Sequence, residues 1–389
     1  MAVHIKELAR IKKNYNMSKI HTFFYFLFLG FPIQRKILFL SYYGSQYGCN
    51  PKYLSEYIVK NRPEWNVVWA FTNPKEYDIE GVKKVRYLSL RYFYELCTSR
   101  VVITNYRMTE DYRKRKGQYY VMTWHSSLRL KKIEKDVEIS LPEHYVQMAK
   151  ADSQKIDLLL SGCKFSDEIF KRAFWYDGVM LQSGTPRCDL FYANNMEEKR
   201  DQIRQELGFG KDVNLLMYAP TFRKGNDLSC YNLNFERLMR VIEEKRNGKW
   251  KVLVRLHPHL LNHTKDVLNG DDIIDVTSYD DIQELLLIAD VLITDYSSLM
   301  FDYAETRRPC FLYTPDLEEY QRDDRSLYFD IKELPFPVSV TQDDLENKIG
   351  SMNQKVYSES ISNFLNKVGS YEDGNASKRV TEYIEKWME

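Results

Sequence analysis

Short apolar runs alternate with helical patterns along most of the chain. Each run is bounded by polar or turn residues, which is typical of a buried strand. In the first half they predict strands at 36–41, 67–71, 101–104, 119–123 and 158–160. A turn-rich segment at 44–48 and a helical pattern at 51–60 follow the first of these strands and predict a β-loop-α unit. Strands of this length separated by helices indicate a parallel sheet with helices on both faces.

The same alternation starts again after Gly208. It predicts strands at 214–219, 251–256, 273–276, 291–294 and 310–313, and helices at 234–245, at 279–288 and from Ser297. A charged helical segment at 196–207 and a glycine-rich turn at 208–210 mark the boundary. We therefore predict the α/β fold class, with an N-terminal domain at 36–207, a C-terminal domain at 208–389 and a ligand cleft between their facing strand ends.

Residues 1–35 precede the alternating strands and helices, and they form a basic segment with one aromatic-rich apolar run. The first 36 residues carry seven Lys or Arg against one Glu, a net charge of +6. An apolar run at 23–29, closed by Gly30 and Pro32, is shorter than the ~20 residues of a membrane-spanning helix. No small-residue cleavage site follows it, as a signal peptide requires. Two interpretations stay open: an amphipathic helix on an anionic membrane surface, which we favour, or a core helix of the first domain.

Composition excludes several classes of protein. The 389 residues are 44% hydrophobic and 29% charged, which excludes a mainly disordered chain. Lys and Arg number 56 against 55 Asp and Glu, and this net charge of +1 gives no reason to expect a nucleic-acid partner. The six cysteines are scattered without paired spacing, so neither a disulfide framework nor a zinc site is predicted.

One strand end in the second half carries a group of short polar side chains suited to phosphate. No G-x-x-x-x-G-K-[ST] or G-x-G-x-x-G motif is present, so the NTPase and dinucleotide-dehydrogenase interpretations lose their main support. Thr294, Asp295, Ser297 and Ser298 lie where a predicted strand meets a predicted helix. Such residues either hold a diphosphate at the helix N-terminus or simply cap the helix.

Arg255 and His257 emerge on the same side of the strand end at 251–256. Arg offers a planar charged fork to phosphate oxygens, and His can donate a hydrogen bond or a proton near neutral pH. His259 and His263 follow, but no Cys or carboxylate stands at a familiar zinc spacing. We therefore predict a phosphate-binding pair and no metal site.

His125 ends a first-half strand, within the segment Trp124-His125-Ser126-Ser127. A histidine there faces the second domain across the predicted cleft, where it can take a proton from an acceptor hydroxyl. The alternative is a structural histidine beside Trp124. Basic stretches at 113–116 and 128–136 are either a solvated face or a contact for anionic lipid or a phosphorylated acceptor.

Six motifs in this order resemble the CDP-glycerol glycerophosphotransferase family, whose members make teichoic acids and have relatives in capsule synthesis. They are Trp124-His125-Ser126, Ser161–Phe174, Gly184–Asp189, Tyr218–Arg223, Arg255–His257 and the block Ser278–Tyr303. The resemblance implies a GT-B-type pair of Rossmann-like domains and transfer of a polyol phosphate from a CDP-activated donor. It also implies peripheral attachment to the cytoplasmic side of the bacterial cell membrane. The primase members are near this length, which favours addition of one or a few units.

The resemblance also assigns roles to residues. The family's essential histidines fall on His125 and His257. In the expected mechanism an acceptor hydroxyl attacks the glycerol-bearing phosphorus of CDP-glycerol, His125 acts as general base and CMP leaves. The expected donor- or phosphate-binding residues are Arg255, Thr294, Ser297, Ser298, Arg223 and Asp295, and further candidates are Asp302, Ser126 and Ser127. The acceptor is then expected on the 36–207 domain and the CDP-polyol on the 208–389 domain.

One stretch departs from the family pattern. The family usually has Trp-His-Gly-Thr-Pro-Leu-Lys, whereas residues 124–131 are Trp-His-Ser-Ser-Leu-Arg-Leu-Lys. Loss of the Gly and the Pro changes the backbone beside His125. We expect the change to affect acceptor recognition more than the reaction class.

The expected partners are CDP-glycerol or another CDP-polyol, a lipid-linked saccharide or polyol-phosphate acceptor, and an anionic membrane surface. No cofactor is expected to be obligatory. Whether a magnesium ion binds the CDP-polyol donor stays open. Two rival functions remain at this point. One is a GT-B glycosyltransferase that uses a nucleotide-sugar, and the other is a non-catalytic assembly protein of the membrane surface.

Overall fold

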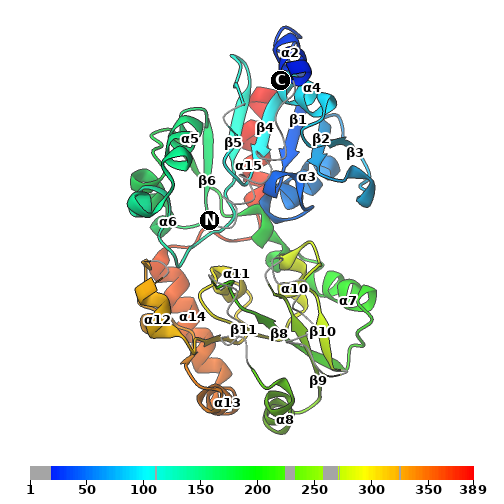
Figure 1. Ribbon diagram of the computed structural model, residues 1–389. Coiled ribbons are helices and arrows are strands. Elements are labelled where there is room, and N and C mark those ends of the chain that lie inside the picture. The colour runs from blue at the N-terminus through cyan, green and yellow to red at the C-terminus, as the bar shows by residue number, and fades with distance from the viewer. Residues whose placement is uncertain (1–18, 110–111, 224–232, 257–269, 271, 324–325) are drawn as a thin grey trace.

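The computed structural model describes residues 19–109, 112–223, 233–256, 270, 272–323 and 326–389. Two lobes are each built around a parallel sheet (Figure 1), which confirms the predicted α/β class. The α-helices are α2 (Lys19–Phe28), α3 (Cys49–Asn61), α4 (Leu90–Thr98), α5 (Glu143–Ser153), α6 (Lys164–Ala173), α7 (Met196–Glu206), α8 (Phe235–Arg246), α10 (Ile282–Ile288), α11 (Leu299–Ala304), α12 (Leu317–Asp323), α13 (Gln342–Ser351), α14 (Gln354–Val368) and α15 (Ala376–Met388).

The N-terminal sheet has seven parallel strands in the order β3-β2-β1-β4-β5-β6-β7. They are β1 (Gln34–Leu40), β2 (Asn66–Phe71), β3 (Val82–Arg86), β4 (Ser99–Thr104), β5 (Tyr119–Met122), β6 (Leu158–Ser161) and β7 (Val179–Gln182). The central strands are apolar on both faces because helices cover both. Leu38 of β1 packs in one cluster with Phe93 of α4, and its neighbour Ile37 packs in another with Ile58 of α3.

The C-terminal sheet has six parallel strands in the order β10-β9-β8-β11-β12-β13. They are β8 (Val213–Ala219), β9 (Lys249–Val254), β10 (Ile273–Asp275), β11 (Val291–Thr294), β12 (Cys310–Tyr313) and β13 (Val338–Ser339). Ile293 of β11 shares a cluster with Leu238 of α8 on one face. Leu292 shares a cluster with Leu286 of α10 on the other. The predicted strands of this half therefore form one sheet with helices on both sides.

Helix α2 presents two different faces. Tyr25 is buried, with its ring centroid 5.4 Å from that of Phe93 in α4 and its hydroxyl oxygen accepting a hydrogen bond from the backbone N–H of Arg113 (3.0 Å). Phe23 and Phe26 are 64% and 48% exposed. The helix thus packs on the N-terminal lobe and also leaves an aromatic face open. Among the helices that the structure describes, none has the length and apolar character needed to cross a membrane.

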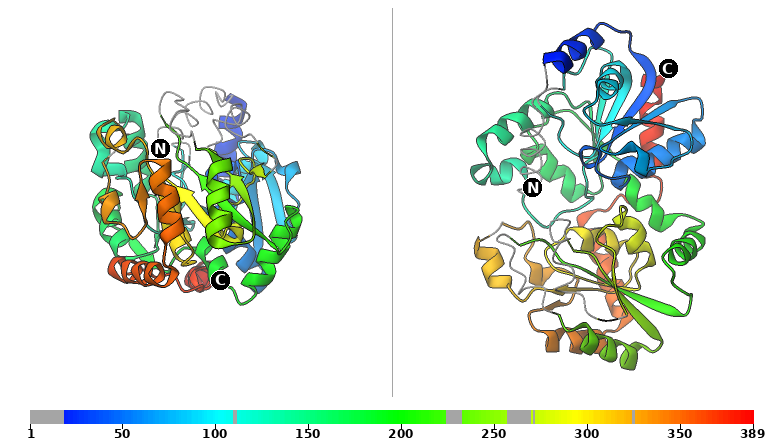
Figure 2. Two further views of the ribbon diagram at one scale, coloured as in Figure 1. Left: turned by 90° about the horizontal axis from the view of Figure 1, so that it is seen from below. Right: turned by 45° about the vertical axis from the view of Figure 1, so that its right-hand side comes forward.

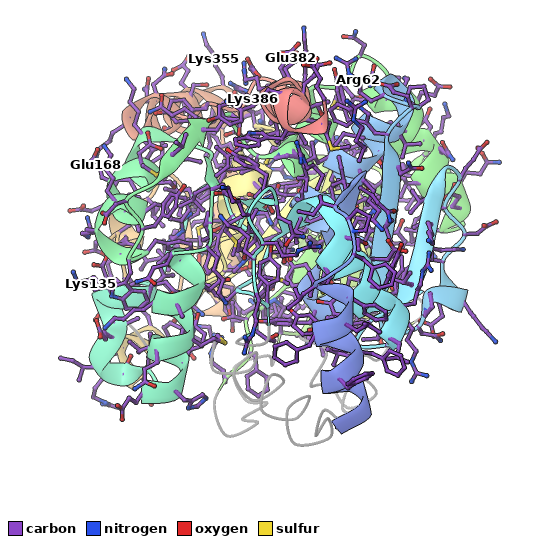
Figure 3. All side chains as sticks on the ribbon, turned by 90° about the horizontal axis from the view of Figure 1, so that it is seen from above. Arg62, Lys135, Glu168, Lys355, Glu382 and Lys386 are labelled. Carbon is purple, nitrogen blue, oxygen red and sulfur yellow. The ribbon has the colours of Figure 1, made fainter. Side chains whose placement is uncertain are left out.

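Helix α15 returns to the N-terminal lobe after the chain has built the second sheet (Figure 1; Figure 2, right). Ile384 belongs to the same buried cluster as Ile37 of β1. The exposed side chains of Glu382 and Lys386 lie on the outer surface of this lobe (Figure 3). Part of the predicted 208–389 domain therefore packs against the N-terminal sheet, and the exact domain bounds stay a prediction.

The packing of α15 predicts a cost for truncating Ile384. Ile384→Ala should lower the free energy of unfolding by about 2–5 kcal/mol, because it leaves a cavity between the helix and the sheet. Urea unfolding followed by circular dichroism measures this loss. Lys386→Ala on the exposed side of the same helix is the control, with an expected change below about 0.5 kcal/mol. Equal losses in the two variants would contradict the packing.

Candidate active site

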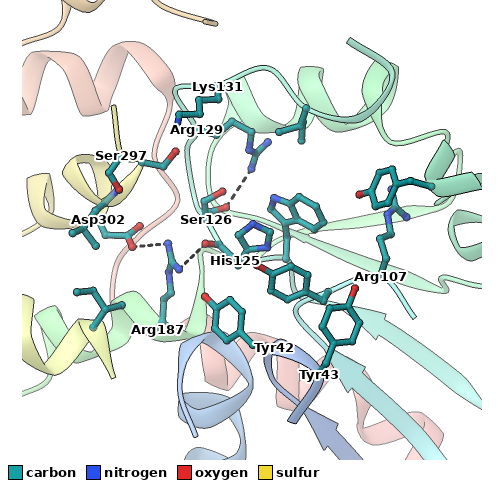
Figure 4. Close-up of a pocket in the computed structure, with 17 residues that line it drawn as sticks. Tyr42, Tyr43, Arg107, His125, Ser126, Arg129, Lys131, Arg187, Ser297 and Asp302 are labelled. Atoms are coloured by element: carbon teal, nitrogen blue, oxygen red, sulfur yellow. Dashed lines mark hydrogen bonds and ion pairs between the residues drawn. The ribbon is translucent and has the colours of Figure 1, made fainter. Parts of the chain in front are cut away.

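A cavity of about 320 Å³ lies between the lobes (Figure 4). The described residues that line it are Tyr42, Tyr43, Tyr106, Arg107, Trp124, His125, Ser126, Arg129, Lys131, Ile133, Tyr145 and Arg187 from the N-terminal lobe, and Ile282, Ser297, Ser298, Leu299 and Asp302 from the C-terminal lobe. Five of the residues predicted from the sequence are among them: His125, Ser126, Ser297, Ser298 and Asp302. The structure thus brings the His125 segment and the start of α11 to one cavity.

His125 is held in a defined orientation. Strand β5 ends at Met122, and a positive φ of 52° at Trp124 turns the backbone toward the cavity. The imidazole stacks on Tyr106 with ring centroids 4.7 Å apart. Its Nδ1 lies 3.2 Å from the carbonyl oxygen of Asn105, which can only accept a hydrogen bond, so Nδ1 carries the proton. In the neutral ring Nε2 is then unprotonated, the form that a general base requires.

Arg187 connects His125 to the opposite wall. It lies in the 3-10 helix Pro186–Tyr192 after β7, and the side chain is buried. Its Nη1 donates to the carbonyl oxygen of His125 (2.6 Å), and its Nη2 pairs with Oδ2 of Asp302 in α11 (2.5 Å; Figure 4). Asp302 holds the pKa of Arg187 well above its usual range despite burial of the guanidinium, which acts in the opposite direction. One buried ion pair therefore joins the two walls.

The serines of the opposite wall are placed by the start of α11. The helix begins at Leu299, two residues later than the sequence predicts, and the hydroxyl of Ser298 makes no capping bond. Instead, Ser298 Oγ accepts from the backbone N–H of Leu130 in the other lobe (3.2 Å). Ser297 Oγ accepts from the N–H of Leu299 (3.3 Å). Both residues line the cavity, and the Ser298 hydroxyl also connects its two walls.

Three other predicted phosphate ligands make contacts within the C-terminal lobe. Thr294 is fully buried and donates from its hydroxyl to the carbonyl oxygen of Ala219 (2.6 Å). Asp295 and Arg223 form a buried ion pair (2.9 Å). Burial raises the pKa of Asp295, although the guanidinium opposes the shift. Arg223 also binds Asp316 (2.6 Å). These groups connect the carboxyl ends of neighbouring strands and are not among the described residues of the cavity wall.

The remaining predicted residues lie near the cavity or outside the described chain. Arg255 follows β9 and donates to the carbonyl oxygen of Tyr279, and burial lowers its pKa. Ser127 is buried behind the wall, with its carbonyl oxygen accepting from Ser166 Oγ (2.5 Å). His257 lies outside the described residues.

Sequence reasoning did not single out several residues of the cavity. The sequence analysis included Arg187 in the motif Gly184–Asp189 but gave it no role of its own. It included Arg129 only in a basic stretch. Arg107 carried no local signal, because its partners Glu134 (3.3 Å) and Asp152 (3.5 Å) are distant in sequence. Across the described ranges, no group of three or more His, Cys, Asp or Glu side chains is arranged to hold a metal ion.

Most of the chain matches the model of a known protein family. The model of the family described as CDP-Glycerol:Poly(glycerophosphate) glycerophosphotransferase matches residues 23–386. The chain belongs to this family. The resemblance predicted from the six ordered motifs is confirmed by this match.

Individual glycerophosphotransferases agree with the family assignment. The teichoic acid poly(glycerol phosphate) polymerase of Bacillus spizizenii is 30% identical over 364 residues, which cover 90% of this chain and 92% of that protein. The teichoic acid glycerol-phosphate transferase of Staphylococcus aureus is 31% identical, with 91% and 93% covered. The chain spans only about half of two longer polymerases, 52% of one and 50% of the other.

A solved member of the glycerophosphotransferase group has the same fold. The structure of the wall teichoic acid polymerase TagF superposes with a TM-score of 0.85 at 29% identity, and the match covers 100% of this chain and 98% of that chain. The two-lobed arrangement is therefore shared along the whole described length.

Proposed function

We propose that this enzyme transfers glycerol phosphate from CDP-glycerol to a hydroxyl group of a membrane-linked acceptor in teichoic acid synthesis, releasing CMP. The family match and the similarity to TagF support this reaction class. A TagF variant with a structure from a CDPG soak, at a TM-score of 0.84, supports the donor. The observation that carries the proposal in this chain is the placement of His125 in the wall of the cavity between the lobes.

The proposed reaction is a displacement at phosphorus. Nε2 of His125 accepts the proton of the acceptor hydroxyl, and the hydroxyl oxygen forms a bond to the glycerol-bearing phosphorus of the donor. The bond from that phosphorus to the bridging oxygen breaks, and CMP leaves with the electron pair. The hydrogen bond from Nδ1 to the Asn105 carbonyl stabilises the tautomer that this step needs.

The proposed donor site is on the C-terminal wall. Ser297 and Ser298 offer hydroxyl groups to phosphate oxygens from the start of α11. Arg255 and His257 are proposed to stabilise charge on the diphosphate, as the family motif Arg255–His257 implies. Arg187 is neutralised by Asp302, so we assign it to positioning of the His125 backbone rather than to phosphate.

The proposed acceptor is attached to the cytoplasmic side of the cell membrane, where the protein binds peripherally. The exposed rings of Phe23 and Phe26 on α2 support this location, as does the net charge of +6 over the first 36 residues. Aromatic side chains beside basic residues bind the headgroup region of anionic bilayers. If the acceptor hydroxyl belongs to a capsular polymer instead, the same reaction would place the enzyme in capsule synthesis.

The proposed function is tested by product analysis. Purified protein, with detergent-solubilised lipid acceptors, should release CMP from CDP-glycerol only when an acceptor is present. CDP-ribitol in a parallel reaction identifies the polyol. Release of a nucleoside diphosphate from a nucleotide-sugar, with no CMP from either CDP-polyol, would replace the proposal by the glycosyltransferase alternative.

A further inference from the structure

Asn50 is a buried asparagine whose amide contacts the backbone just before His125. It lies in the first turn of α3 and is 0% exposed. Its Nδ2 donates to the carbonyl oxygen of Thr123 (3.1 Å) and to that of Trp124 (3.0 Å). Because Nδ2 carries two hydrogens, these bonds use all of its donor capacity. The amide therefore ties the two peptide groups before His125 to a helix from a distant part of the sequence.

The oxygen of the same amide holds a second part of the cavity wall. Oδ1 of Asn50 accepts from the backbone N–H of Arg187 (3.1 Å). Arg187 in turn donates from Nη1 to the carbonyl oxygen of His125 (2.6 Å). Three successive carbonyl groups, ending with that of His125, are thus held in place. Asn50 binds the first two, and the arginine that Asn50 anchors binds the third.

The backbone held by Asn50 has an unfavourable conformation. Trp124 has a φ of 52°, in the left-handed region that residues other than glycine rarely adopt. The carbonyl groups on both sides of its Cα bond to the same Nδ2. The Thr123 hydroxyl also lies 3.0 Å from the Trp124 carbonyl, but it belongs to the same segment and attaches it to no other element. Such conformations persist where the surrounding structure fixes them, so loss of the amide should release this backbone.

The orientation of the His125 ring depends on where this backbone lies. The ring contacts the loop after β4, through the carbonyl oxygen of Asn105 (3.2 Å from Nδ1) and the stacked ring of Tyr106 (4.7 Å between centroids). The backbone of His125 is held from α3 and Arg187 instead. A shift of the backbone relative to the β4 loop therefore breaks the contact that keeps the proton on Nδ1.

We propose that Asn50 is a positioning residue for the reaction, because it holds the backbone of His125 so that Nε2 meets the acceptor hydroxyl. This inference rests on the proposed function, in which His125 is the general base. Asn50 is not among the described residues that line the cavity, so it acts through His125. An asparagine amide offers the two donors and the acceptor that this place requires, whereas a carboxylate of the same shape has no donor.

The kinetic test is a double-mutant cycle with His125. Asn50→Ala should lower kcat for CMP release by about ten- to hundredfold, the effect of a displacement near 1 Å, and change the KM of CDP-glycerol by less than about twofold. In the His125→Ala protein the same substitution should change kcat by less than about twofold, because the residue through which Asn50 acts is gone. Losses that multiply in the double variant would overturn the proposal, as would an unchanged kcat in Asn50→Ala.

Two further variants separate positioning from the stability of α3. Ile58→Ala on the same helix removes buried apolar contacts, so it should lower the melting temperature while kcat stays within about twofold of wild type. A loss of kcat equal to that of Asn50→Ala would assign the effect to the helix and overturn the proposal. Asn50→Asp keeps the shape but lacks the donors, so it should also lose kcat. It replaces the alanine variant if that variant does not fold, and a wild-type kcat in Asn50→Asp would contradict the positioning role.

Nitrogen NMR of the histidine rings supplies a measurement that requires no turnover. At a pH where the ring is neutral, His125 of the wild-type protein should be one tautomer, with its proton on Nδ1. His125→Ala identifies its signals among those of the seven histidines. Asn50→Ala should give a mixture of both tautomers, and Ile58→Ala should not. A single, unchanged tautomer in Asn50→Ala would overturn the proposal.

The NMR measurement also separates this inference from the proposed function. If no CDP-polyol yields CMP while the His125 tautomer changes only in Asn50→Ala, the hold of Asn50 on His125 stands and the reaction assignment fails. If wild type and Asn50→Ala release CMP at the same rate, the reaction stands and the positioning role fails.

Discussion

Replacing His125 with alanine should lower kcat for CMP release by about 10²- to 10⁴-fold, the range for loss of a general base. His125 lines the cavity, and the contact of its Nδ1 with the Asn105 carbonyl leaves Nε2 as the unprotonated nitrogen of the neutral ring. Removal of the side chain takes away the proton acceptor and leaves both walls in place, because Arg187 binds the backbone carbonyl of residue 125 and not the ring. The KM of CDP-glycerol should therefore change little.

The matched control for this variant is His144→Ala. His144 is exposed on α5 and does not line the cavity. Its substitution should leave kcat within about twofold, as expected for a surface change away from the site. If His125→Ala retained more than about a tenth of wild-type kcat, a general-base role would be contradicted, since that loss is below the range for such a group.

Breaking the buried Arg187–Asp302 pair, one of the ion pairs that join the lobes, should have a large effect on stability. Arg187→Met leaves the carboxylate of Asp302 buried with Gln283 Nε2 as its remaining donor (2.9 Å). Removal of one partner of a buried pair costs about 3–5 kcal/mol. The double variant Arg187→Met with Asp302→Leu removes both charges and should recover most of that loss.

Activity should not recover in the double variant. Arg187 Nη1 donates to the His125 carbonyl, and methionine cannot replace that hydrogen bond. Urea unfolding measures stability, and CMP release measures activity. Arg172→Met, which removes an exposed pair with Asp136, is the control and should cost at most about 1 kcal/mol. A double variant with wild-type kcat would show that Arg187 does not position His125.

The central strands and the edge strand β10 were predictable, whereas the edge strands β3, β7 and β13 were not. Runs such as 37–40 and 291–293 are apolar at every position because both faces of the strand are covered. Strand β3 contains Lys83 and Lys84, and β7 is mostly half-exposed, so neither carries a continuous apolar signal. Edge strands have one unpaired side and tolerate charge, which removes the pattern that predicts them.

Part of the candidate site was predictable because its residues directly follow buried strands. His125, Ser297 and Ser298 lie just after strand ends, where residues of parallel sheets gather at one edge. Thr294 has the same sequence signal, but it is the last residue of β11 and its hydroxyl faces the neighbouring strand. Arg187 depends on a long-range partner, Asp302, which no local pattern encodes.

The return of α15 to the N-terminal lobe bears on how the protein is made. Residues 376–388 cover one face of a sheet whose strands lie at 34–182. Helix α3 covers part of that face early in synthesis, but the part that α15 covers stays open until almost two hundred further residues have left the ribosome. The C-terminal lobe is thus translated, and has time to fold, while the first sheet still lacks a helix. Chaperones that bind exposed apolar strands would bind the nascent chain during this interval. The N-terminal lobe therefore completes its folding last, although its strands are synthesised first.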